Sequence, residues 1–81
     1  MKGRVTVRLK AGVLDVQGKA IAGALGGLGF DGVDAVRVGK VFEVELATTD
    51  SAQAKAQLEA MAEKLLANPV MESFTVEVVG G

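Results

Sequence analysis

Two stretches near opposite ends of the chain alternate strictly between apolar and polar side chains. The apolar positions are Val5, Val7 and Leu9 in the first stretch and Phe74, Val76 and Val78 in the second. A period of two residues is typical of a β-strand that buries one face. The alternation therefore predicts a strand near each end of the chain, and any fold must bring these two buried faces to one core.

A third apolar series lies in the middle of the chain. Its members share one parity and are Val36, Val38, Phe42, Val44 and Leu46. A two-residue hairpin at Gly39 and Lys40 would place Val36 opposite Glu43, so the apolar faces would not match. We therefore expect one long strand that bends near Gly39, or two strands separated by a bulge.

Two helices are predicted between these strands. The first spans about residues 17–28, with Asp15 at its N-cap and Gly29 at its C-terminal end. Its apolar stripe consists of Ile21, Leu25 and Leu28. Four glycines disfavour this helix, so we expect close packing to stabilise it.

The second helix has the better helical sequence. Asp50 and Gln53 resemble a capping box at its start, and Asn68 followed by Pro69 marks its end. Its expected apolar stripe consists of Ala54, Leu58, Met61 and Leu65.

This order of elements predicts a single domain over residues 1–81 of the α+β class. The expected architecture is a two-layer sandwich, with an antiparallel sheet and two helices on one face. If the middle segment counts as two strands, the order is βα(ββ)αβ, which is ferredoxin-like. With 81 residues and three aromatic side chains, the chain has a small core, and we expect self-association to add burial.

The residue inventory argues against an enzyme that acts alone. The chain has no cysteine and no histidine, which removes the usual zinc ligands and any Ser-His or Cys-His arrangement. Gly27, Gly29 and Gly32 match the dinucleotide-binding spacing, but that motif must open a helix, whereas here it closes one. We expect no catalytic, cofactor-binding or metal-binding residues.

Charge is distributed unevenly, although the net charge is −1. Residues 1–40 hold seven of the nine Lys and Arg residues and three of the ten acids. Such a basic half can bind nucleic acid, but no Tyr or Trp is present to stack on bases. We favour cross-strand pairing with Glu43, Glu45 and Glu77. The first residues contain no apolar leader and no segment long enough to span a bilayer, so we expect a cytoplasmic protein without membrane contact.

The segment LKAGVLDVQG, residues 9–18, resembles the LK-x-GVLDPQG signature of the PurS family, the small subunit of phosphoribosylformylglycinamidine synthase. The likeness continues at residues 24–25, 28–30, 36–40, 42–43, 63–70, 72 and 74–78. It departs at Val16, where the family usually has proline. Proline suits the first position of a helix, so Val16 should loosen the helix entry without changing the fold.

The resemblance implies a role that composition does not show. Complexes of this family convert formylglycinamide ribonucleotide, glutamine and ATP to formylglycinamidine ribonucleotide in purine biosynthesis, with Mg²⁺. A large synthetase subunit and a glutaminase subunit carry that ATP-dependent ligase chemistry. The small subunit is implied to be a non-catalytic adaptor that bridges them, supports ammonia transfer and forms dimers or tetramers. The alternative is a stand-alone ferredoxin-like domain that binds a ligand or nucleic acid.

Six residues are candidates for contact with the partner subunits. They are Lys10, Leu14, Asp15, Gln17, Arg37 and Lys40. The first four lie in the loop between the first strand and the first helix, and their spacing fits neither element. Packing within the strand or the helix therefore does not explain these side chains. Surface loops often carry binding residues, so we expect this loop to contact a partner.

Overall fold

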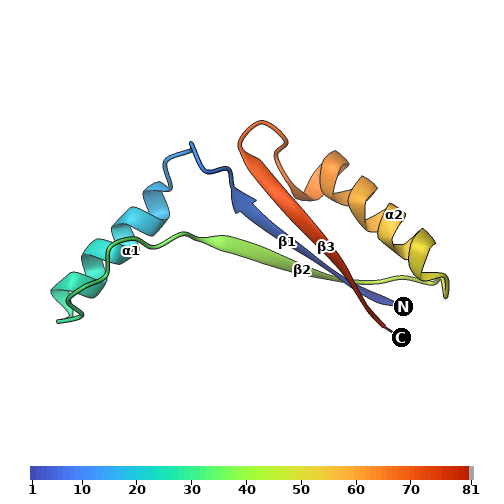
Figure 1. Cartoon of the computed structure of the whole chain (residues 1–81), viewed down its shortest axis with the longest axis horizontal. Coiled ribbons are helices and arrows are strands. Elements are labelled where there is room, and N and C mark those ends of the chain that lie inside the picture. The colour runs from blue at the N-terminus through green and yellow to red at the C-terminus, as the bar shows by residue number, and fades with distance from the viewer. Residues whose placement is uncertain (81) are drawn as a thin grey trace.

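The structure is a computed structural model that describes residues 1–80, and it contains an antiparallel sheet with two main helices (Figure 1). The elements in chain order are β1 (Lys2–Leu9), α1 (Val16–Gly27), β2 (Gly39–Glu45), α2 (Ser51–Met61), the π-helical turn η1 (Ala62–Leu66) and β3 (Glu72–Gly80). The predicted α+β class and the two terminal strands are confirmed.

The sheet places the first strand at its centre, in the order β2-β1-β3. Both pairings are antiparallel, and Val5 lies opposite Phe42 on one side and Val76 on the other. This register puts the apolar residues of β1 and β3 on one face together with Phe42 and Val44 of β2, as their parity predicts.

The opposite face of the sheet is charged. Arg4 lies between Glu43 and Glu77, and its guanidinium lies 3.9 Å from the Glu77 carboxylate. The predicted cross-strand pairing is thereby confirmed for Arg4 and Glu77, although an exposed pair of this kind adds little stability.

Helix α2 covers the apolar face over β1 and β3. Val5, Leu58 and Ala62 are fully buried, and Val7 is almost fully buried. Gly3 allows Leu58 to approach the sheet, because a Cβ at this position would collide with the leucine side chain. The core of the single chain is thus the contact between one helix and two strands.

The π-helical turn changes the apolar stripe of the second helix. Ala62 is fully buried and Leu66 packs against the core, whereas Leu65 is 83% exposed. The stripe predicted for α2 is therefore wrong at Leu65, although it is confirmed at Ala54 and Leu58. A π turn holds more residues than an α turn, so it rotates the residues that follow it about the helix axis.

The middle segment contains one strand and no hairpin, but the strand begins at Gly39, later than its apolar parity predicts. Strand β1 ends at Leu9, and its last pairing with β2 joins Arg8 to Gly39. The segment before Gly39 has no strand partner in the described chain. The Val38 N–H instead donates to the carboxylate of Asp15.

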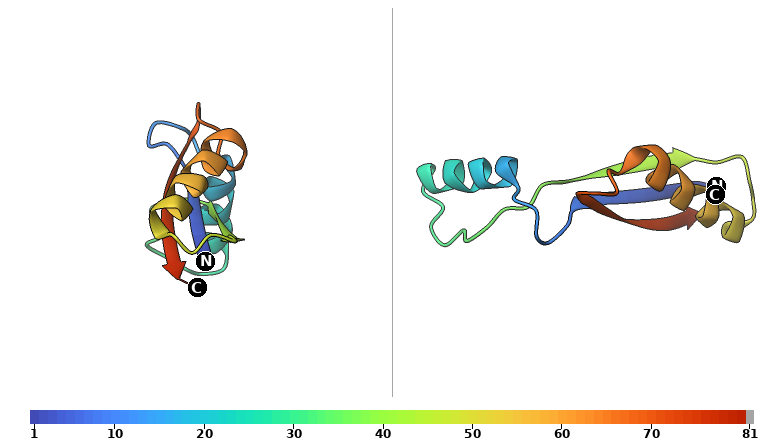
Figure 2. Two further views of the ribbon diagram at one scale, coloured as in Figure 1. Left: turned by 90° about the vertical axis from the view of Figure 1, so that its right-hand side faces the viewer. Right: turned by 90° about the horizontal axis from the view of Figure 1, so that it is seen from above.

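Helix α1 lies beyond the end of the sheet and covers neither face (Figures 1 and 2). The expectation that both helices cover one face is therefore wrong for α1. The chain measures 48 × 26 × 14 Å and its radius of gyration is 16.0 Å. A compact chain of this length has a radius of gyration of about 12 Å. The single chain is thus elongated, with one of its two main helices outside the core.

Candidate functional site

The joint between the sheet and α1, which we call the elbow, consists of residues 9–18 and 36–38. Asp15 is its centre, because both of its carboxylate oxygens accept backbone hydrogen bonds. The Gly18 N–H donates to Oδ1 and the Val38 N–H donates to Oδ2, and each N···O distance is 2.7 Å. Asp15 is therefore an N-cap, as predicted, and it also ties the start of α1 to the segment before β2.

The environment of Asp15 favours its charged form. The hydrogen bond from the Val38 N–H, followed by that from Gly18, lowers the pKa of the Asp15 carboxyl from its ordinary value of 3.8. Burial acts in the opposite direction, and the positive charge of Arg37 lowers the pKa further. The residue is 7% exposed. It positions the elbow, and its predicted contact with a partner subunit stays a prediction.

Arg37 holds the loop from the outside. Its guanidinium donates hydrogen bonds to the carbonyl oxygens of Leu9 (3.2 Å), Lys10 (3.1 Å) and Val13 (3.3 Å). Three carbonyls from a single loop therefore converge on one planar donor group, a geometry that a lysine cannot reproduce. Most of the hydrogen-bonding capacity of Arg37 is used within the chain.

Gly18 allows α1 to lie close to the segment that precedes β2. A Cβ at this position would collide with the carbonyl oxygen of Val36. In contrast, a Cβ at Gly23 or Gly26 would meet nothing within 4 Å. The expectation that glycine allows close packing is thus confirmed at Gly18, at the base of α1, whereas Gly23 and Gly26 face open space among the described residues.

Other predicted contact residues surround the elbow. A hollow of about 330 Å³ is bordered by Asp15, Gln17 and Lys40, together with β-strand residues. The Lys40 ammonium lies 4.0 Å from the Glu72 carboxylate. Lys10 is exposed, and its ammonium donates to the carbonyl oxygen of Pro69 over 2.8 Å. The structure thus brings these predicted residues to one end of the sheet.

Leu14 and Val16 form an apolar tip on the elbow. They are 68% and 70% exposed. A buried loop leucine would cap the core, but Leu14 faces solvent in the single chain. Its contact with a partner stays a prediction, as it does for Lys10, Gln17, Arg37 and Lys40.

The far end of α1 closes with glycine. The Phe30 N–H donates to the Leu25 carbonyl oxygen, and the Gly29 N–H donates to the Gly26 carbonyl oxygen. Both N···O distances are 3.1 Å. Gly29 has φ +94°. This is a Schellman motif, in which a residue of positive φ ends the helix. The Gly27–Gly32 spacing therefore closes a helix, and it does not form the strand-to-helix turn that binds a dinucleotide.

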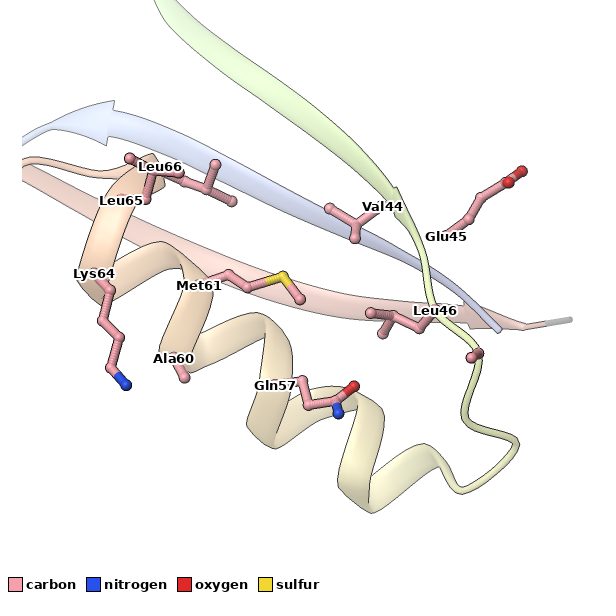
Figure 3. Close-up of a pocket in the computed structure, with 10 residues that line it drawn as sticks. Val44, Glu45, Leu46, Gln57, Ala60, Met61, Lys64, Leu65 and Leu66 are labelled. Atoms are coloured by element: carbon pink, nitrogen blue, oxygen red, sulfur yellow. The ribbon is translucent and has the colours of Figure 1, made fainter.

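A groove that the sequence analysis missed lies between β2 and α2 (Figure 3). Its volume is about 690 Å³. Val44 and Leu46 point into it from the strand side, and Met61 and Leu66 point into it from the helix side. Leu65 also lines it. The parity of Val44 and Leu46 placed them on the inner face, but it could not reveal that a groove remains between them and α2.

Within residues 1–80, no three Asp or Glu side chains come together as a metal site would require. The helices of this described part are also too short, or too polar, to cross a membrane.

Comparison with known proteins gives one consistent match. The PurS family, described as phosphoribosylformylglycinamidine (FGAM) synthase, matches residues 2–80. The chain is 50% identical to the phosphoribosylformylglycinamidine synthase subunit PurS of Mycobacterium leprae over 72 residues, which cover 89% of this chain and 87% of that protein.

Two solved structures share the fold. The PurS crystal structure from Methanocaldococcus jannaschii has a TM-score of 0.89 and 35% identity, and the match covers 99% of this chain and 96% of that one. A chain in the structure of PurLQS from Thermotoga maritima has a TM-score of 0.84 and 28% identity, over 94% of this chain and 93% of that one. The ferredoxin-like type of fold expected from the sequence is confirmed by these neighbours. The chain therefore belongs to the PurS family of FGAM synthase subunits.

Proposed function

We propose that this chain is the small, non-catalytic adaptor of an FGAM synthase complex in purine biosynthesis. It bridges a synthetase subunit and a glutaminase subunit, and it supports the transfer of ammonia from one to the other. The observation that carries this proposal is the family match over residues 2–80, joined to the likeness to a chain of a structure described as PurLQS.

The geometry offers surfaces suited to such a role. The elbow projects an apolar tip at Leu14 and Val16. Its backbone is held in place by hydrogen bonds that the Asp15 carboxylate accepts and that the Arg37 guanidinium donates. A preorganised loop loses little entropy when it binds a partner. We assign the elbow, with Lys10, Gln17 and Lys40 at its rim, to contact with the other subunits.

The chemistry of the complex belongs to the other subunits in this proposal. ATP, Mg²⁺ and glutamine are bound there, and this chain binds none of them. The chain offers no histidine or cysteine for nucleophilic attack on glutamine. It works in the cytoplasm with its partners and self-associates as a dimer or tetramer.

Reconstitution of the complex tests the adaptor role. The isolated chain should show no glutaminase or ATPase activity, and its addition to the other two subunits should raise glutamine-dependent turnover. Turnover with free ammonia should respond much less, because free ammonia needs no transfer between subunits. Equal increases in the two rates would contradict the bridging role.

The alternative is a stand-alone domain that binds nucleic acid through β1. The charged face of the sheet weakens it, because Arg4 lies between Glu43 and Glu77. Recovery of RNA rather than the two other subunits, when the chain is isolated from its cells, would favour this alternative.

A further inference from the structure

We infer that the charged outer face of the sheet carries a docking site for an acidic segment of the same partner subunit that contacts the elbow. The site, which we call the Arg8 patch, consists of Thr6, Arg8, Arg37, Ser73 and Thr75. The inference rests on the proposed function, because it takes the occupant to be another subunit of the complex. Three observations point to it: an unpaired charge, a hollowed surface and continuity with the elbow.

The first observation is that the charges of the outer face are balanced at one end only. Arg4 lies between two glutamates, whereas the cross-strand neighbours of Arg8 are Gly39 and Ser73. The two glutamates lie about 13 Å from Arg8 along the strands, beyond the screening length of about 8 Å at physiological ionic strength. Neither ion pair of residues 1–80 involves Arg8. The described part of the chain therefore supplies no acidic partner for this side chain.

The second observation is that the surface beside Arg8 is hollowed. One hollow, of about 300 Å³, is lined on the β3 side by Ser73 and Thr75. Another, of about 350 Å³, is lined on the β2 side by Arg37 and the start of the strand. Thr6 and Arg8 border both hollows. Guanidinium and hydroxyl groups donate hydrogen bonds, so this lining suits carboxylate groups.

Gly39 keeps the β2 side of the Arg8 patch open. A Cβ at this position would lie 3.2 Å from Cγ of Arg8 and 2.9 Å from the carbonyl oxygen of Val7. The stem of the Arg8 side chain therefore lies against bare backbone of β2, where any larger residue would displace it. Arg8 is also exposed, so its guanidinium is accessible to a carboxylate of another chain.

The third observation is that the Arg8 patch continues into the elbow through Arg37. This residue lines the β2-side hollow and also donates three hydrogen bonds to the elbow loop. A subunit that covers the elbow therefore reaches the patch next, and a positive patch is complementary to acidic side chains. An RNA backbone fits less well, because the glutamates beside Arg4 share the face and would repel a run of phosphates.

The positions of the two hollows set the shape of the occupant. Strands β2 and β3 flank β1, so their axes are about 10 Å apart. In a polyproline-like segment, residues three apart lie on the same side and are separated by about 9 Å. One extended segment that crosses the three strands would thus place an acidic side chain in each hollow, with the Arg8 guanidinium between them.

Binding of the full chain to each of the other two subunits tests the site, with Arg8→Gln and Arg4→Gln as matched variants. Both changes remove one positive charge from the outer face of β1, so effects of net charge cancel between them. At low salt, Arg8→Gln should weaken binding to one subunit about tenfold, whereas Arg4→Gln should change it by about twofold or less. Salt should also weaken the Arg8→Gln complex less steeply than the native one. Equal weakening by the two variants would overturn the inference.

Ser73→Glu supplies the missing carboxylate from within the chain, directly opposite Arg8. The variant should melt at the native temperature or above it, because it gains a cross-strand pair of opposite charges. It should also bind the same subunit about tenfold more weakly, because the Arg8 guanidinium is then already paired. A folded Ser73→Glu chain that binds as tightly as the native chain would overturn the inference.

The outcomes separate the Arg8 patch from the proposed function. If the native chain binds neither subunit, the adaptor role and the docking site fail together. If the native chain and all three variants bind alike, the adaptor role stands and the site is overturned. The site is also overturned if Arg8→Gln binds the subunits normally but sediments as a different oligomer, or if it loses RNA that the native chain retains. Those two results would assign the patch to a second copy or to nucleic acid.

Discussion

The two helices of this chain are stabilised in opposite ways. Helix α2 buries Ala54 and Leu58 against the sheet, and its start is capped by Asp50, which accepts from the N–H groups of Ala52 and Gln53. Helix α1 buries no apolar side chain, and it is attached to the sheet through the polar elbow. The comparison shows that one helix belongs to the core of its own chain, while the other is directed outward.

The largest effect should come from emptying the core beneath α2. Leu58→Ala should lower the free energy of unfolding by about 3 kcal/mol, because the side chain is fully buried and its removal leaves a cavity. Leu65→Ala, the matched control on the following π turn, should change it by about 0.5 kcal/mol or less in dilute solution. Denaturant titration measures both. Similar losses for the two variants would contradict the assignment of Leu65 to solvent.

The second prediction compares two glycines of α1. Gly18→Ala should destabilise the elbow by about 2 kcal/mol, because the new Cβ collides with the Val36 carbonyl. Gly23→Ala has open space around it and should stabilise the helix by about 1 kcal/mol. Circular dichroism and thermal melting report the two changes. Loss of helix in both variants would mean that α1 is packed closely along its whole length.

The third prediction concerns pH. The lowered pKa of Asp15 means that its stabilising effect is fully present above 3.8 and is lost as the pH falls through the lower folded-state value. An Asp15→Asn variant keeps an amide oxygen but no titrating group, so its α1 helicity should lack this acid-dependent step. The difference in melting temperature between the native chain and the variant should shrink as the solution is acidified. A constant difference from pH 7 to below 3.8 would contradict the prediction.

The smallest effects on stability should distinguish Arg37 from Lys40, which the sequence analysis proposed alike as contact residues. Arg37→Glu removes three exposed hydrogen bonds to the loop and should destabilise the chain by about 1 kcal/mol. Lys40→Glu loses one ion pair of 4.0 Å and should cost about 0.5 kcal/mol or less. Both variants should bind the other subunits more weakly in a pull-down. A Lys40→Glu chain that assembles normally would remove Lys40 from the interface and leave Arg37 and the elbow loop.

Local signals were sufficient to predict the parts of the fold that depend on near neighbours. The strands follow from side-chain alternation, and the caps at Asp15 and Asp50 follow from residue type and position. The second half of the capping box differs, because Thr48 rather than Gln53 accepts from the Asp50 N–H and in turn donates to the Gln53 amide oxygen.

The candidate site was harder to predict, because its geometry depends on distant residues. Asp15 accepts from Val38, twenty-three residues away, and no local pattern indicates that bond. The exposure of Leu65 depends on a π turn, and the groove depends on the absence of α1 from the sheet face. Sequence likeness located the elbow segment, while the role of Arg37 within it required the three carbonyl contacts.

The hydrogen bonds of the elbow have a mechanical consequence. Helix α1 is twelve residues long, so it is a lever of about 18 Å attached at one end. A rotation of about 10° at its base would displace its tip by about 3 Å, more than half the pitch of an α-helix. The direction of the α1 axis is therefore fixed by the hydrogen bonds of Asp15 and Arg37 and by the close approach at Gly18. A substitution at the elbow can misdirect the tip at Leu28 without touching any residue there.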